Sequence, residues 1–470
     1  MPAMLIQPLE PAVPDPRRWL ALAVLLTGTF LPPLDFFIVN VALPSIRADL
    51  QASSDVSQLV ISVYAAAYAV TLILGGRLGD LYGRKRVFVG GMLGFGLASA
   101  LCGLAPSPGV LVVGRLLQGI SAAIMAPQTL ASIHALFPPS EKGRALSLYG
   151  AAIGLASVGG QLLGGLLISA NPWGLGWRAV FLINLPVIMA AVPAALALLR
   201  ENATERAARL DVPGALLLAS GLLALVVPLI EGREHHWPWW CIALLALSLP
   251  LLYAFWRYET RRELAGQTPL VLPSLLRSPG LRRSLAATFL FYALAAFFLV
   301  FAVYEQAGLG HDALSAGLAV LPLGIGFFLG PLCGPPVARY LGTRTAAFGM
   351  ILEASGLAAA AVLAVSGASA WLPPPLFLIG LGQGIALPAL VRLNVDQVDA
   401  RWAGLASGLV NATLQISAAV SVALIGGLFI AIAPDGAAAR DVWLAFAVAS
   451  SAIGAALALA AGLSWSPIEK

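Results

Sequence analysis

The chain has 470 residues, of which 59% are hydrophobic and only 10% are charged, and its mean hydropathy is +0.89. Soluble domains are about a quarter charged, so lipid must solvate most of this chain and no soluble catalytic domain fits. A net charge of +5 and a pI of about 9.3 are compatible with nucleic-acid binding, but the basic residues are not clustered on a soluble module. We therefore expect no nucleic-acid partner.

Apolar runs long enough to cross a bilayer recur along the whole sequence. A spanning helix needs about 20 predominantly apolar residues. Fourteen runs meet this description, at residues 18–41, 56–75, 87–105, 109–132, 145–169, 177–199, 212–230, 238–256, 284–303, 314–337, 345–366, 372–391, 403–432 and 442–463. They predict an all-α polytopic membrane protein with 14 transmembrane helices, the first of which is not a cleaved signal.

The positive charges favour one orientation for these helices. If the N-terminus lies inside, the inner segments hold 22 of the 27 Lys and Arg residues, the outer segments hold four, and Arg115 lies within a span. Cytoplasmic loops carry an excess of Lys and Arg, so this bias predicts that both termini are cytoplasmic. The proline-rich segment 1–17 is expected to be a disordered cytoplasmic tail, and 464–470 a second tail.

Two charged loops, at about 200–211 and 257–283, bracket spans seven and eight and divide the spans into six, two and six. The expected domains are an N-terminal six-helix bundle, linker loops with two inserted helices, and a C-terminal six-helix bundle. Their bounds are 18–199, 200–283 and 284–463.

A weak internal repeat supports this division. Gly83 and Lys85 correspond to Gly342 and Arg344 after a shift of 259 residues. The tripeptide that begins at Gln118 recurs in the second half as Gln383-Gly384-Ile385. Many secondary transporters are built from repeats, with the substrate site between the halves near the midplane.

Three ionisable side chains lie inside predicted spans, where a charge is costly and needs a reason. They are Asp35 in span one, Arg115 in span four and Glu353 in span eleven. Burial disfavours an ionised carboxylate and a nearby cation favours it, so the protonation of Asp35 can depend on conformation. Arg115 keeps its charge and is an obvious partner for Asp35. We expect Asp35 and Arg115 to take part in proton coupling, with a fixed structural pair as the alternative.

Other acidic residues are less distinctive. Glu353 is expected to be a second protonatable site or to reach the membrane interface. Glu231 and Glu305 fall at predicted outer ends of spans, where we expect them to be solvated.

The loop after span two is rich in glycine and charge. Its carboxylate can cap and pair across a helix end, its basic residues hold the inner face, and its glycines allow tight turns. We expect a charged latch that holds one conformation and releases in another. Its residues are Gly76, Gly79, Asp80, Gly83, Arg84, Lys85 and Arg86.

Glycines elsewhere predict close helix packing. Gly160 and Gly164 in span five form a GxxxG pair. Gly380-Leu-Gly382-Gln-Gly384 lacks the Lys-Ser/Thr that follows a nucleotide-binding loop, so packing is the better interpretation. No Walker motif, zinc spacing or catalytic triad pattern is present.

We therefore expect no enzyme activity and no cofactor. Three cysteines lie singly in or beside apolar runs, and we expect small buried side chains with no disulfide and no metal. They are Cys102, Cys241 and Cys333.

In the motifs of its first, fourth and fifth spans and of the loop after span two, the chain resembles the major facilitator superfamily and, more narrowly, its 14-span drug:proton antiporter branch. Leu34-Asp35 through Pro44 is similar to the first-helix motif of that branch, and Gly76 to Arg86 to the loop signature of the superfamily. The fourth-helix motif matches Arg115, Gln118 and Gly119, and the resemblance implies that this arginine takes part in proton transfer. The segment from Trp177 to Pro186 resembles the sixth-helix entry.

The fifth-helix antiporter motif shows one departure. The matching residues are Gly160, Gln161, Gly164 and Gly165, and the usual proline is replaced by Gln161. The spacing of the glycines matches the motif. The resemblance therefore implies the fold more firmly than it implies antiport of substrate and protons.

Together these features predict a proton-coupled secondary transporter that exports small amphipathic or cationic compounds by alternating access. Its expected partners are the small-molecule substrate, protons and the lipid bilayer, and the resemblance implies a monomer in a bacterial inner membrane. An exporter of an endogenous metabolite, siderophore or lipid-like molecule is the nearest alternative, and a membrane receptor without transport is a second. Candidate cavity residues are Phe36, Phe37, Asn40, Tyr64, Tyr68 and Gln118.

Overall fold

The computed structural model describes residues 15–52, 54–201, 211–232, 237–267, 269–311, 313–398, 403–434 and 436–465. Throughout these ranges the regular structure is helical, and they contain no strand. The prediction of an all-α membrane protein is confirmed. Twelve candidate spans in the same ranges are long and apolar enough to cross a bilayer.

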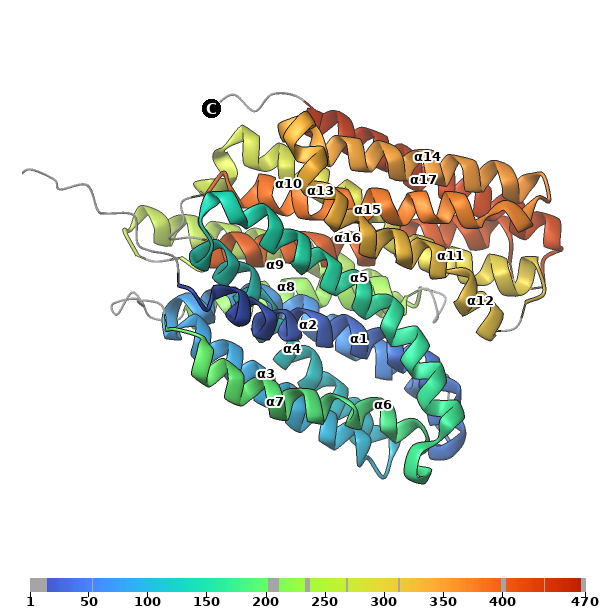
Figure 1. Ribbon diagram of the computed structural model, residues 1–470, viewed down its shortest axis with the longest axis horizontal. Helices are drawn as coiled ribbons and strands as arrows, with labels where there is room; N and C mark the ends of the chain where they lie inside the picture. The colour runs from blue at the N-terminus through green and yellow to red at the C-terminus, as the bar shows by residue number, and fades with distance from the viewer. Residues whose placement is uncertain are drawn as a thin grey trace, which may run out of the picture.

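The helices form two bundles with a pair of helices between them in the chain (Figure 1). The blue-to-green bundle contains α1 (Arg18–Leu50), α2 (Ser54–Tyr82), α3 (Arg84–Gly103), α4 (Pro108–Leu136), α5 (Pro139–Ala170), α6 (Ala179–Leu182) and α7 (Asn184–Leu198). The pair is α8 (Val212–Glu231) and α9 (Trp239–Leu264). The yellow-to-red bundle contains α10 (Pro279–Phe291), α11 (Ala295–Val303), α12 (Ala313–Ala319), α13 (Leu321–Leu341), α14 (Thr345–Val365), α15 (Pro373–Val395), α16 (Ala403–Ile432) and α17 (Ala439–Trp465).

The expected count of fourteen spans is not confirmed. The described part of the chain has twelve candidate spans, or thirteen if the bent pair Leu59–Leu72 and Leu74–Tyr82 within α2 is one span. One of the twelve, Ser315–Val365, is 51 residues long and contains both α13 and α14. These two helices are joined by a single 3₁₀ turn, Gly342–Arg344, so no long polar loop separates them.

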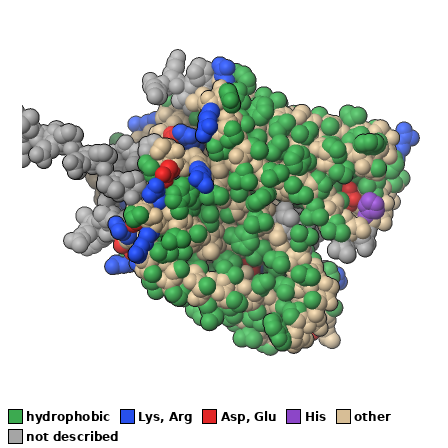
Figure 2. Space-filling model, viewed as in Figure 1, with side chains coloured by type: hydrophobic (Ala, Val, Ile, Leu, Met, Phe, Trp, Pro, Cys, Tyr) green, Lys and Arg blue, Asp and Glu red, His purple; other side chains and the backbone are tan. Residues whose placement is uncertain are grey.

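Lys and Arg side chains gather at one end of the molecule (Figure 2). We call it the basic end; Arg84, Lys85 and Arg86 at the start of α3 and Arg344 at the start of α14 lie there. α1 begins and α17 ends at this end as well (Figure 1). Such a one-sided distribution of basic residues is typical of the cytoplasmic face of a membrane protein.

The two bundles are packed together near the basic end. One hydrophobic cluster contains Leu22 and Ile133 of the first bundle together with Phe327 of the second. The basic half of α5 also lies against the second bundle, because a Cβ atom on Gly150 would be 2.9 Å from Pro388. Burial of apolar surface therefore closes the interface between the two bundles at the basic end.

At the opposite end the bundles are apart. The hydrophobic cluster there in the first bundle includes Ile46, Leu111 and Phe181, and no described side chain of the second bundle belongs to it. The far half of α5 instead packs on its own bundle, where a Cβ atom on Gly160 would lie 2.7 Å from the carbonyl oxygen of Leu34. Figure 1 shows the bundles diverging away from the basic end.

Two side chains contradict their predicted exposure. Glu305 is only 3% exposed, because a π-helical turn at Tyr304–Gly308 places its carboxylate inside, where Oε2 lies 2.8 Å from His311 Nδ1. Cys333 is exposed, because it lies on the same open face of α13 as Leu329 and Leu332, which are 36% and 44% exposed. The side chain of Glu231 lies outside the described part.

Glycines allow α13 and α15 to approach closely. A Cβ atom on Gly330 would lie 2.6 Å from the carbonyl oxygen of Leu381 and 2.7 Å from the Cα atom of Gly384. A Cβ atom on Gly384 would lie 2.7 Å from the carbonyl oxygen of Phe327. The predicted packing role of the glycines in span twelve is therefore confirmed.

Gly330→Leu should lower the free energy of unfolding by about 1–3 kcal/mol, because the added side chain forces α13 and α15 apart. Gly334→Leu, one turn along the same helix, is the control, because an added Cβ there meets open space. It should change stability by less than about 0.5 kcal/mol. Thermal unfolding of both purified variants measures the difference, and equal losses would contradict the packing argument.

Candidate functional site

A fully buried ion pair joins α1 and α4 in the interior of the first bundle. Arg115 Nη1 donates a hydrogen bond to Asp35 Oδ2, and both side chains are 0% exposed. Removal of either partner would leave an uncompensated buried charge, which typically costs 3–5 kcal/mol. Each charge is therefore compensated by the other.

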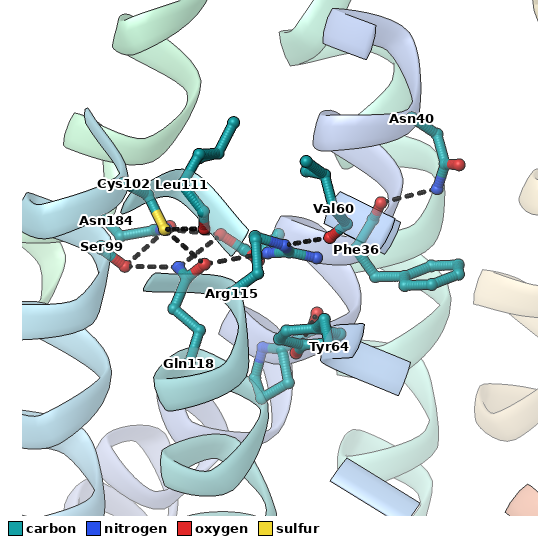
Figure 3. A network of polar contacts seen from close by, with 12 residues as sticks. Phe36, Asn40, Val60, Tyr64, Ser99, Cys102, Leu111, Arg115, Gln118 and Asn184 are labelled. Carbon is teal, nitrogen blue, oxygen red and sulfur yellow. Dashed lines mark hydrogen bonds and ion pairs between the residues drawn. The ribbon is translucent and has the colours of Figure 1, made fainter. Parts of the chain in front are cut away.

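The second carboxylate oxygen of Asp35 has two amide partners. Oδ1 accepts hydrogen bonds from Gln118 Nε2 and from Asn184 Nδ2, both at 3.0 Å. The same two amides donate to Ser99 Oγ, at 2.8 and 3.3 Å. α3, α4 and α7 thus converge on the carboxylate through one continuous network (Figure 3).

Arg115 is held on its other side by α2. Its Nε donates to the carbonyl oxygen of Val60 at 2.9 Å, and its guanidinium lies 4.1 Å from the centre of the Tyr64 ring. Nη1 also donates to Gln118 Oε1 at 2.9 Å. Among the described residues, Nη2 has no hydrogen-bond partner. A π face and a carbonyl stabilise a cation but do not neutralise it, so Asp35 provides the countercharge.

This arrangement links the protonation of one group to the structure around it. A proton on Asp35 would remove the countercharge of Arg115 in a place without exposed surface. The cation would then need water or another partner, and the helices would have to move to supply one. Loss of the charge on Asp35 would therefore destabilise the present arrangement of these helices.

Two members of the network were not identified from the sequence. Ser99 and Asn184 are buried at 0% and 1% exposure and complete the shell of Asp35. Asn184 could have been noticed, because it is the one amide in the apolar run 177–199. Ser99 carries no comparable signal, since serine is common in packed membrane helices.

The candidate cavity residues divide into two groups. Gln118 and Tyr64 are buried, at 0% and 4% exposure, and belong to the network instead of lining open space. Phe36, Phe37, and Tyr68 are half-buried and Asn40 is exposed. That this second group lines a substrate cavity stays a prediction.

An aromatic contact spans the two bundles at the depth of the network. The rings of Phe36 and Tyr64 have centroids 6.3 Å apart, and those of Phe36 and Phe37 are 5.4 Å apart. Phe37 in turn lies 6.2 Å from Phe298 of α11. A row of rings therefore leads from the Arg115 cation to the second bundle.

Glu353 lies away from this site. It is fully buried in α14, and neither carboxylate oxygen has a hydrogen-bond partner in the described part of the chain. α15 packs directly on it, because a Cβ atom on Gly382 would be 2.9 Å from the Glu353 Cβ. The structure does not bring Glu353 together with Asp35 and Arg115, and it does not expose Glu353 at the interface.

The predicted latch lies at the basic end of α2 and α3. Arg84 donates to the carbonyl oxygen of Ala131 at 2.8 Å and approaches Asp80 at 3.5 Å. Lys85 Nζ donates to the carbonyl oxygen of Leu196 at 2.7 Å, and Arg86 lies 3.6 Å from Glu201. These contacts tie together α2, α3, α4 and the end of α7.

The glycines of the latch allow close packing. A Cβ atom on Gly79 would collide with the amide of Gln128, and Gly83 has a φ of 95°, which favours glycine. Gly76 is buried in α2.

The glycines of the fifth-helix motif have different surroundings. An added Cβ on Gly160 or Gly164 would contact α1, whereas one on Gly165 would meet nothing within 4 Å. The side chain of Gln161 lies outside the described part. No group of three or more His, Cys, Asp or Glu residues that could hold a metal occurs among the described residues.

A match to the Major Facilitator Superfamily covers residues 25–422. The chain belongs to this superfamily. A relative named "Probable actinorhodin transporter" from Streptomyces coelicolor is 38% identical over 422 residues, which are 88% of this chain and 73% of that protein. Puromycin resistance protein pur8 of Streptomyces alboniger is 38% identical over 423 residues, covering 88% and 82%. Multidrug resistance protein Stp of Mycobacterium tuberculosis is 31% identical over 408 residues, covering 86% and 74%.

The solved structure of the human organic anion transporter MFSD10 has the same fold. Its TM-score is 0.66 at 18% sequence identity, and the match covers 96% of this chain and 100% of that one. The superfamily match and the named relatives show that this major facilitator protein is a transporter and not an enzyme. It takes small-molecule substrates within a lipid bilayer.

Asn184→Ala should lower the free energy of unfolding by about 1–3 kcal/mol, because it removes a donor from a buried carboxylate. Asn40→Ala is the matched control, since Asn40 is exposed and its amide donates only to the Phe36 carbonyl of its own helix. Thermal unfolding in detergent should separate the two variants. If Asn184→Ala were as stable as Asn40→Ala, the network would not hold the bundle together.

Proposed function

We propose that this transporter exports small organic compounds in exchange for protons and that Asp35 is the proton carrier. The supporting observation is a fully buried carboxylate whose countercharge is the fixed cation Arg115. Arginine does not release its proton under physiological conditions, so the carboxylate is the member of the pair that can change charge. Gln118 and Asn184 donate hydrogen bonds to the carboxylate, and Ser99 orients these two amides.

The proposed orientation places the basic end in the cytoplasm. The excess of Lys and Arg at that end supports cytoplasmic termini in the inner membrane. The contacts between Gly150 and the second bundle then seal the cytoplasmic side, and the diverging bundles face outward. A path between two halves of one chain needs no second copy, so we propose a monomer.

The proposed cycle alternates the charge of Asp35. Substrate binds from the cytoplasm while Asp35 is ionised, and the bundles then rock so that the path opens outward. A proton from outside neutralises Asp35, and the substrate leaves. The return movement carries the proton inward, where Arg115 favours its release by stabilising the carboxylate.

The proton gradient provides enough free energy for this exchange. A proton that crosses a potential of about 100 mV gains about 2.3 kcal/mol. One unit of pH difference adds about 1.4 kcal/mol. One proton per neutral substrate can thus sustain a concentration ratio on the order of a few hundred-fold.

The relatives support antibiotic-like compounds as the substrate class. Their names refer to actinorhodin, puromycin and multidrug resistance. The aromatic row at Phe36, Phe37 and Phe298 would suit planar apolar parts of such molecules. The alternative cargo is a compound that the cell itself makes, since other relatives are named as export proteins for tetracenomycin C and cephamycin. Sensitivity of a deletion strain to many compounds would favour drugs, whereas one accumulated metabolite would favour the alternative.

Asp35→Asn should abolish substrate-driven proton movement and reduce active efflux to the level seen with an uncoupler, because the amide cannot alternate in charge. Reconstituted vesicles with a pH-sensitive dye measure proton flux. Asp49→Asn is the control, because Asp49 is half-exposed and pairs with Arg178 away from the network. Energy-dependent efflux that persists unchanged in Asp35→Asn would defeat the assignment of Asp35.

We propose a separate role for Glu353, in which it holds its proton throughout the cycle. An ionised carboxylate with no partner would cost several kcal/mol in this packed interior. Glu353→Gln resembles the protonated acid in size and charge, so efflux and its pH dependence should match the wild type. A loss of proton-coupled efflux in Glu353→Gln with normal folding would instead make Glu353 a second coupling residue.

The charged segment from Gly76 to Arg86 is proposed to act as the latch of the cytoplasmic side. Its contacts with Ala131, Leu196 and Glu201 support this role, because they join helices that must move as a unit.

A further inference from the structure

A groove on the inserted helix pair lies outside the path between the bundles. α8 and α9 pack against each other, and α8 also contacts α2 and α16. The groove has a volume of about 490 Å³ and lies toward the basic end of α9. Its lining residues are Leu217, Tyr253, Ala254, Arg257, Tyr258 and Arg261.

Along α9, the exposed side chains change from apolar to basic toward the basic end. The parts of a phospholipid follow the same order from acyl chain to headgroup. Leu249, Tyr253, Arg257 and Arg261 follow one another at four-residue intervals, and all four are exposed. Residues at this spacing lie about 6 Å apart on one side of a helix. Toward the basic end, the face therefore presents an aliphatic side chain, an aromatic hydroxyl and two cations. Acyl chain, ester region and phosphate follow the same order in a membrane leaflet.

Among the described residues, no acid pairs with either arginine of the groove, whereas Arg262 beside them is paired. Arg262 Nη1 lies 3.3 Å from Asp211 Oδ1, which also accepts a hydrogen bond from Tyr258 at 3.0 Å. These contacts point inward and fix α9 against the start of α8. Neither Arg257 nor Arg261 forms an ion pair with any residue that the structure describes. Their positive charge is therefore available to a ligand from the membrane.

We propose that this groove binds a phospholipid with an anionic headgroup from the leaflet at the basic end. The phosphate lies between Arg257 and Arg261, because guanidinium groups bind phosphate oxygens in a bidentate geometry. Tyr253 contacts the ester region, and the acyl chains follow Leu217 and Leu249. Two uncompensated cations select an anionic lipid over a zwitterionic one, as basic pockets between membrane helices do.

Native mass spectrometry of the full chain in a neutral detergent tests this site. Phosphatidylglycerol, phosphatidylcholine and inorganic phosphate are titrated in separate arms. Phosphatidylglycerol should bind to the wild type at least about tenfold more tightly than phosphatidylcholine, and phosphate alone should not be retained. Equal retention of the two lipids, or retention of free phosphate, would overturn the proposal.

Two variants locate the binding. Arg257→Gln combined with Arg261→Gln should weaken phosphatidylglycerol binding by about tenfold or more, since each arginine near a headgroup contributes to affinity. Arg277→Gln combined with Arg282→Gln is the charge-matched control, because both residues are exposed and lie outside the groove. Equal losses in the two double variants would indicate diffuse attraction and overturn the proposal.

Ala254→Trp provides a test that leaves the charge unchanged. The indole fills the groove, so phosphatidylglycerol binding should fall as it does in the Arg257 and Arg261 variant. Unaltered binding to a folded Ala254→Trp protein would show that the lipid lies elsewhere.

Discussion

The buried pair of Asp35 and Arg115 constrains the whole first bundle. Neither charge reaches solvent, so both must be satisfied by groups that the surrounding helices supply. α1 and α4 provide the pair itself, while α2, α3 and α7 provide the Val60 carbonyl, Ser99 and Asn184. A shift of α1, α2, α4 or α7 breaks a contact to a buried charge, and a shift of α3 breaks the contacts of Ser99 that orient the Gln118 and Asn184 amides. The site is therefore both the chemical centre of the bundle and the feature that fixes the register of its helices.

Hydropathy was sufficient to predict the membrane fold, because the length and apolar character of a span belong to one contiguous stretch of sequence. The partnership of Asp35 and Arg115 was also accessible, since few charges lie within spans and a buried carboxylate needs a cation. The count of fourteen spans, in contrast, is not confirmed, because apolar length alone does not divide the described chain into the same segments. The short turn at Gly342–Arg344 makes two helices read as one apolar segment of 51 residues, and the bend within α2 leaves its count ambiguous.

The remaining differences concern the direction of side chains. Sequence position gives the depth of a residue in the membrane, but the rotation of its helix decides what it faces. Glu353 has a depth suitable for a coupling residue, yet it faces α15. Glu305 lies at the end of its helix, yet a π-helical turn directs it inside. Ser99 and Asn184 enter the network only because their helices converge on Asp35, which no local pattern encodes.

The two halves of α5 pack on different bundles, so this helix connects α1 mechanically to the second bundle. Its far half packs on the backbone of α1 at Leu34, next to Asp35, because Gly160 leaves no side chain between the helices. Its half at the basic end places Gly150 against Pro388 of the second bundle. A displacement of α1 beside Asp35 would therefore be transmitted along α5 to its contact with the opposite bundle. Under the proposed coupling, a bond made or lost at the carboxylate would loosen a hydrophobic contact several helical turns away.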